Sequence, residues 1–252
     1  MSNTYPSCEK KSLHQDLRDV FLDLPDCFLE GEELKKNVNV WYVAKGILLA
    51  YMESFGYSKY NAMGILGYRT HLLTSISIKK IIEACLGKKK IKNLLDIGAG
   101  SGTVTEKFEQ YTESISCIEP SESFQKILCK KGYKIVDEND IKLYEIITMF
   151  NVLDRCEKPL ELLKKGINAL SKRGIIMVSL PLPTDNYGKI YSSLSLSEHA
   201  TFESATNELY NILRGNGLKI KAFSCIPYIV LLPNIKYSIN YQNALFICSK
   251  QK

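Results

Sequence analysis

The sequence lacks long apolar runs, and this absence excludes a membrane-spanning protein. No apolar stretch approaches the roughly 18 residues that cross a bilayer as a helix. The first residues, MSNTYPSCEKKSLHQDLRD, contain charges but no apolar core behind them, so they do not resemble a secretory signal peptide. We therefore expect a cytoplasmic protein without a membrane partner.

Histidine is scarce and the cysteines are scattered, which argues against a metal site. The three histidines are His14, His71 and His199, and none of the eight cysteines forms a C-x-x-C pair. Structural zinc needs clustered soft ligands, so we expect no metal. Reduced thiols, several of them acting as small buried apolar groups, are the expected state of these cysteines.

The chain also lacks a strong excess of one charge, since its formal net charge is only +6. Short lysine groups, such as Lys88–Lys90 and Lys164–Lys165, could contact nucleic acid. No stripe of aromatic residues accompanies them, which favours solvated helix ends and loops. We expect no nucleic-acid partner.

The pattern of apolar residues changes near residue 75 and divides the chain into two predicted regions. Residues 1–75 form a helical N-terminal extension with a covering loop, and residues 76–252 form the main domain. Within the extension we predict a helix near Leu13 to Leu22, helical periodicity over 31–55, and a glycine-punctuated loop over 54–70.

Strand-like and helix-like segments alternate after residue 90, which is typical of a doubly wound parallel sheet. The last two strands have no helix between them, which indicates an antiparallel C-terminal edge. We therefore predict an α/β fold, the Rossmann-like fold of class I methyltransferases. The expected strands cover 93–97, 114–119, 133–136, 144–150, 174–183, 218–228 and 243–250, and the helices cover 76–86, 121–132, 158–170 and 201–217.

The sharpest local motif is a glycine-rich turn, LLDIGAGSG, at the end of the first strand. Gly98 and Gly100 allow a tight turn and bring bare backbone close to a ligand. The spacing is G-x-G-x-G rather than the dinucleotide pattern G-x-G-x-x-G. Asp96 suits a cofactor with positively charged amino and sulfonium ends better than a pyrophosphate. We therefore expect S-adenosyl-L-methionine as the cofactor.

Two further segments extend this predicted cofactor site. Glu119 closes the second strand, where a carboxylate can accept hydrogen bonds from both ribose hydroxyls; the alternative is an acid that caps the next helix. After the third strand, Asp137, Asn139 and Asp140 are candidates for contacting adenine, and spacing alone does not choose among them.

The fourth strand ends in Asn151-Val152-Leu153-Asp154-Arg155-Cys156, which we predict to be the chemical site. It lacks the prolines and the aromatic residue of DNA amino-methylases, so a base would have no stacking platform. Asn151 and Asp154 instead offer an amide and a carboxylate on one turn. Asp154 could alternatively cap the helix that starts near Pro159.

Taken together, LLDIGAGSGTVT, CIEPSE, FNVLDRCEKPLELLK, SLPLP and a late Pro-Tyr resemble the DREV family, most specifically in N-V-L-D-R-C. The resemblance implies a protein-histidine methyltransferase that modifies the pros nitrogen, giving 1-methylhistidine, within His-x-His motifs. It implies Asn151 and Asp154 as catalytic residues holding the substrate imidazole. It assigns the methyl donor to Asp96, Gly98, Gly100 and Glu119. Asn139 and Asp140 are further candidates from their place after the third strand rather than from the resemblance.

The same resemblance implies that Tyr228 lines the substrate channel, with Tyr237 and Tyr241 as further substrate-binding candidates. These last two tyrosines are displaced from the family positions, and the family's neighbouring acids are absent. Such departures concern peptide preference more than chemistry. The expected partners are proteins or peptides containing His-x-His, and we expect a monomer.

Two other readings of the residues remain open. A methyltransferase could act on another protein nitrogen or on a small molecule, because an amide with a carboxylate also suits a primary amine. A scaffold could bind the donor without catalysis, in which case changes at Asn151 and Asp154 would be silent.

Overall fold

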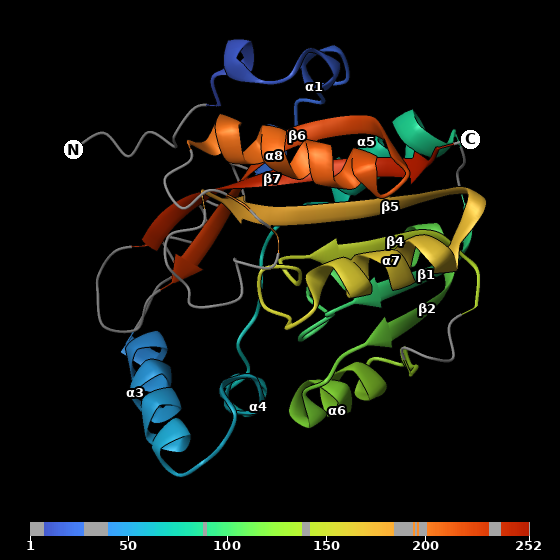
Figure 1. Ribbon diagram of the computed structural model, residues 1–252. Helices are drawn as coiled ribbons and strands as arrows, with labels where there is room; N and C mark the ends of the chain where they lie inside the picture. Colours follow the sequence, from blue (N-terminus) through green and yellow to red (C-terminus); the bar gives the residue numbers. More distant parts are fainter. Residues whose placement is uncertain are drawn as a thin grey trace.

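The structure is built around a seven-stranded sheet in the order β3-β2-β1-β4-β5-β7-β6 (Figure 1). This computed structural model describes residues 8–27, 40–87, 90–137, 142–183, 194, 196, 201–231 and 238–251. The strands are β1 (Ile91–Ile97), β2 (Thr112–Ile118), β3 (Lys134–Ile135), β4 (Tyr144–Phe150), β5 (Leu170–Leu182), β6 (Leu218–Leu231) and β7 (Ser238–Lys250).

Strands β1 to β5 pair in parallel, and β7 runs antiparallel between β5 and β6. The predicted doubly wound sheet with an antiparallel C-terminal edge is therefore confirmed. The chain leaves β1 outward to β3 and then returns to β4 on the other side of β1. Strand order thus reverses between β1 and β4, which is where open α/β sheets bind ligands.

Helices cover both faces of the sheet. Helices α7 (Pro159–Ala169) and α8 (Phe202–Gly215) lie in front of it in Figure 1, and α5 (Ser75–Leu86) lies behind. Their buried side chains belong to two separate apolar clusters, one on each face. No helix among the described residues is long and apolar enough to span a bilayer. The remaining helices are η1 (Lys10–Ser12), α1 (Gln15–Asp19), α3 (Val40–Ser54), α4 (Lys59–Ile65), η2 (Thr105–Tyr111) and α6 (Glu122–Lys130).

The caps that the sequence indicates are present on the core helices. Ser121 begins α6 by accepting a hydrogen bond from the N–H of Phe124, and Pro159 occupies the first turn of α7. Helices α5, α6, α7 and α8 therefore confirm the helices predicted after residue 75.

The helix predicted from Leu13 to Leu22 is only partly correct, because α1 ends at Asp19. Beyond α1 the chain extends along β6: the N–H of Leu22 donates to the carbonyl of Phe223 at 2.7 Å, and the N–H of Phe223 donates to Val20 at 3.0 Å. This pairing satisfies backbone N–H and C=O groups of β6 at the open edge of the sheet. A further turn of α1 would leave those groups without a backbone partner. The N-terminal segment thus covers the outer strand.

The loop predicted over 54–70 is wrong over its middle, where α4 forms. The glycines of this segment indicated a break in the helix, but Gly64 is a helix–helix packing residue. A Cβ at this position would overlap the side chain of Ser123 on α6. Ser58 caps the helix, accepting from the N–H of Asn61 at 3.4 Å. Close helix–helix contact therefore overrides the local helix-breaking tendency of glycine.

Candidate active site

The turns that follow β1 and β4 lie against each other at the reversal of strand order. Gly98 has a φ of +80°, and a Cβ placed on it would come within 2.8 Å of a Val152 methyl group. Gly100 has a φ of +55°, and nothing lies within 4 Å of the position of its missing Cβ. One glycine therefore allows the two turns to pack, and the other leaves backbone open to a ligand.

Asp96 is buried at the end of β1, directly beside β4. Its carboxylate accepts hydrogen bonds from the hydroxyls of Thr105, at 2.5 Å, and Thr148, at 2.8 Å. Thr148 is its neighbour in the β1–β4 register. Burial raises the pKa of Asp96, and the two hydroxyl groups oppose that shift. Asp96, the acid predicted to contact the methyl donor, is thus held in place by two hydrogen bonds next to the glycine turn.

Glu119 reaches from the end of β2 to the same glycine turn. One carboxylate oxygen accepts from the N–H of Gly100 at 2.8 Å, and the other accepts from the N–H of Ser121 at 2.9 Å. Burial raises the pKa of Glu119, although both backbone donors act in the opposite direction. The structure therefore brings together Asp96, Gly98, Gly100 and Glu119, as the sequence predicted.

Asn151 follows β4 with a left-handed φ of +51°, which asparagine tolerates better than most residues. Its Oδ1 atom accepts hydrogen bonds from Ser179 Oγ and Asn243 Nδ2, each at 3.0 Å. Its Nδ2 atom is buried and makes no hydrogen bond within the described residues. The amide is thus fixed through its oxygen and leaves a donor group unused.

Asp154 completes the turn as a buried carboxylate with one oxygen engaged. Oδ2 accepts from Arg155 Nε at 3.2 Å, while Oδ1 is buried without a hydrogen-bond partner in the described part of the chain. Burial raises the pKa of Asp154, and Arg155 lowers it. Asp154 does not cap α7, because the N-cap residue of that helix is Lys158 and no side chain among the described residues caps it. Asp154 is instead only 4% exposed.

Arg155 joins this turn to the C-terminal strands. Its Nη2 atom donates to the hydroxyl of Tyr228 on β6 at 2.9 Å. The predicted substrate residue Tyr228 therefore lies one side chain away from Asp154. Arg155 has no role that its sequence position predicts, apart from its place within N-V-L-D-R-C.

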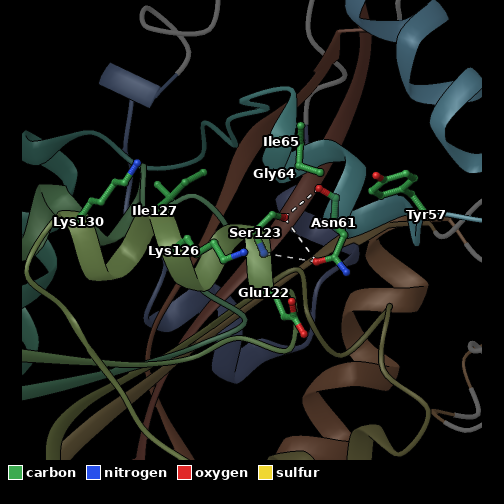
Figure 2. Close-up of a pocket in the computed structure, with 9 residues that line it drawn as sticks. All are labelled: Tyr57, Asn61, Gly64, Ile65, Glu122, Ser123, Lys126, Ile127 and Lys130. Atoms are coloured by element: carbon green, nitrogen blue, oxygen red, sulfur yellow. Dashed lines mark hydrogen bonds between the residues drawn. The ribbon is translucent and has the colours of Figure 1, made fainter.

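Helix α4 is fastened to the helix that follows Glu119. Figure 2 shows Asn61 of α4 directed at Ser123 of α6, beside a groove between the two helices. The carbonyl of Asn61 accepts from Ser123 Oγ, and its side-chain oxygen accepts from Ser121 Oγ, both at 2.8 Å. The groove itself is lined by α4, the residue Tyr57 and α6, and so lies apart from the Asp154 turn.

This attachment brings Tyr60, next to Asn61, into the candidate site. Burial raises the pKa of Tyr60, Arg155 lowers it, and Asp154, Tyr228 and Glu119 raise it further. The phenol therefore lies within electrostatic range of Glu119 and of the Asp154 turn, while the residue as a whole is 39% exposed. Tyr60 could not be assigned from the sequence, because the glycines around it indicate a loop. Ser58, which caps α4, was the signal for a helix here.

Some predicted residues lie where no side-chain position is described. Asn139, Asp140 and Tyr237 fall outside the described residues. Tyr241 is described only through its backbone, which lies opposite Tyr228 in the β6–β7 register. Among the described residues, no three His, Cys, Asp or Glu side chains cluster closely enough to hold a metal ion.

Comparison with known proteins agrees with this architecture. A family model described as DREV methyltransferase matches residues 8–248. A candidate methyltransferase from Bacillus halodurans C-125 is similar in structure, with a TM-score of 0.53, 13% identity, and coverage of 70% of this chain and 100% of that one. A structure containing the Haloferax volcanii Trm112 methyltransferase activator and a candidate methyltransferase matches with a TM-score of 0.52 and 11% identity, covering 78% and 99%. At such identities the two structures show a shared fold.

The contact between the two turns can be tested by comparing two glycines with similar backbones. Gly98→Ala and Gly132→Ala both place a side chain at a positive φ, which costs about 1–2 kcal/mol. Only Gly98→Ala also presses against Val152, so it should lower the free energy of unfolding by a further ~1–3 kcal/mol. Urea denaturation measures both. Equal losses would show that the turns do not pack as described.

Proposed function

The chain belongs to the DREV methyltransferase family, and from this we propose that it is an S-adenosylmethionine-dependent protein-histidine methyltransferase. In this proposal it modifies the pros nitrogen, producing 1-methylhistidine, in His-x-His segments. One observation carries the proposal. On the turn after β4, a buried donor atom, Asn151 Nδ2, and a buried acceptor atom, Asp154 Oδ1, are both without partners in the described residues.

Unpartnered buried polar atoms are costly, so they indicate a ligand that pairs with them. Leaving one such group unsatisfied costs roughly 1–3 kcal/mol, and native proteins keep few of them. A neutral imidazole has one N–H group to donate, and Asp154 Oδ1 is an acceptor for it. Asn151 Nδ2 is then available to a carbonyl oxygen of the substrate chain, which fixes the plane of the ring.

The residues around the glycine turn fit S-adenosylmethionine. Gly100 leaves open space at a positive φ, as close approach of a cofactor to the backbone requires. Glu119 supplies carboxylate acceptors for ribose hydroxyls at the end of the second strand, and Asp96 supplies negative charge near the end of the first. When bound, this cofactor supplies an electrophilic methyl group on a sulfonium.

The residues of the β4 turn would then orient the attacking nitrogen. Histidine reacts as neutral imidazole, and the hydrogen bond at one ring nitrogen selects which nitrogen keeps its lone pair. If Asp154 accepts from the tele N–H, the pros nitrogen is free to attack. The ring becomes cationic as the new N–C bond forms, and the carboxylate stabilises a charge that exists mainly in the transition state.

Peptide assays test the substrate class directly. The protein, a labelled methyl donor and peptides containing His-x-His should give a product whose methyl group mass spectrometry places on histidine, and the two ring isomers can be distinguished by fragmentation against standards. A peptide with both histidines replaced by glutamine is the control. Methyl transfer to lysine, or to the control peptide at an equal rate, would contradict the histidine assignment.

Replacing Asp154, the proposed hydrogen-bond acceptor for the imidazole, tests its role. We expect Asp154→Asn to lower kcat at least about 100-fold, the scale of losing one preorganised electrostatic contact in a transition state, while donor affinity measured by calorimetry stays within about twofold. The exposed acid Asp23 offers a control, since Asp23→Asn should leave both quantities unchanged. Parallel losses of turnover and donor affinity would mean that Asp154 serves the donor site instead.

The raised pKa of Glu119 predicts how donor affinity depends on pH. The ionised carboxylate accepts ribose hydroxyls, so affinity is lost as Glu119 is protonated on lowering the pH. Because burial raises its pKa, that loss should begin at a higher pH than for an exposed glutamate, whose pKa is about 4.3.

Calorimetric titration of the donor between about pH 4 and pH 8 measures this loss. Glu119→Gln should bind the donor more weakly at neutral pH and show a much smaller acid loss. The exposed neighbour Glu122 provides the control, because Glu122→Gln should keep the wild-type profile. An unchanged profile in Glu119→Gln would rule out Glu119 as the titrating group.

A further inference from the structure

The amide of Asn151 is held by residues from two other strands that the proposed chemistry does not use. Asn243 of β7 donates its Nδ2 to Asn151 Oδ1 at 3.0 Å, across 92 residues of sequence. Ser179 of β5 donates its hydroxyl to the same oxygen at 3.0 Å. The backbone N–H of Asn151 also donates to the carbonyl of Ser179 at 2.9 Å.

These contacts determine which side of the amide remains available. A carboxamide has an accepting oxygen and a donating nitrogen. With both neighbours donating to the oxygen, Asn151 keeps only its NH₂ group free, and Asn243 and Ser179 are themselves fully buried. In this arrangement, rotating the Asn151 amide alone by 180° would place its NH₂ group against the NH₂ group of Asn243, which is unfavourable.

A second observation points to a ligand at the same place. Asn243 Oδ1 is buried and, within the described residues, has no hydrogen-bond partner, like Asn151 Nδ2. The two unpartnered atoms belong to amides that are joined by one hydrogen bond, so one donor and one acceptor of this pair are left over. A core that merely needed polar residues to pair with each other would not leave both atoms unsatisfied.

We propose that Asn243 and Ser179 are positioning residues, which orient the Asn151 amide so that its NH₂ group is presented to the substrate. The inference rests on the proposed function of Asn151 and deepens it. Neither residue needs to touch the reacting atoms, because each acts through the oxygen of Asn151. The site therefore extends from the β4 turn to β5 and β7, the antiparallel strand.

A double-mutant cycle tests the coupling. Asn243→Leu keeps the number and branching of the heavy side-chain atoms and removes the donor. We expect kcat with a His-x-His peptide to fall about 10-fold, the effect of one lost hydrogen bond of roughly 1.4 kcal/mol. In an Asn151→Ala background the same change should have almost no further effect. A loss of equal size in both backgrounds would overturn the proposal, because it would show that Asn243 acts independently of Asn151.

Controls separate orientation from general damage to the fold. Ser224→Ala removes a buried hydroxyl from strand β6 that makes no hydrogen bond within the described residues, and it should leave kcat and the affinity for the methyl donor unchanged. Ser179→Ala should lower kcat in the same direction as Asn243→Leu. Donor affinity should stay within about twofold in Asn243→Leu, since the glycine turn is intact; a larger fall would contradict a role confined to Asn151.

A readout without catalysis distinguishes this proposal from the proposed function. In protein carrying ¹⁵N-labelled asparagine, the side-chain NH₂ resonances of Asn151, assigned by their loss in Asn151→Ala, should shift in Asn243→Leu and not in Ser224→Ala. Shifted resonances without histidine methylation would refute the proposed function and keep the positioning role. Histidine methylation with unshifted resonances and unchanged kcat would do the reverse.

Discussion

The structure depends on the contact between two turns at the point where strand order reverses. Gly98 has no side chain, so Val152 can pack onto it, and the turns after β1 and β4 become one surface. This contact brings the predicted donor residues and Asn151 to the same edge of the sheet. A doubly wound sheet supplies such a reversal by topology, but only the glycine lets the two turns approach closely.

Burial without pairing distinguishes the β4 turn from the acids of the glycine turn. The donor acids are satisfied by their own chain, because Asp96 accepts from two threonines and Glu119 from two backbone N–H groups. Asn151 and Asp154 each keep one atom without such a contact in the described residues. The residues around the glycine turn are thus preorganised by internal hydrogen bonds. In the proposed function the substrate would complete the β4 turn, and the unpaired atoms carry a cost in stability that functional sites commonly show.

The geometry of the glycine turn is more predictable from the sequence than the contacts of the β4 turn, for a physical reason. Glycine spacing and strand-terminal acids are local features. Gly98, Gly100 and Glu119 could therefore be identified from the short segment that contains β1 and β2. Arg155 meets Tyr228 across 73 residues, and Asn151 meets Asn243 across 92. No local periodicity encodes such contacts. Helix α4 was missed for a related reason, since Gly64 is favourable there only because α6 lies against it.

The environment of Asp154 combines two opposing influences that suit the proposed reaction. Burial raises its pKa and makes the carboxylate a better proton acceptor, while the charge of Arg155 lowers the pKa and favours the ionised form. Arg155 does so through Oδ2 alone, so Oδ1 remains available to the imidazole N–H. As the ring becomes cationic, the same oxygen can take the ring proton and release neutral methylhistidine. A carboxylate without the arginine would be protonated more readily before the reaction, and one in water would hold the imidazole less strongly.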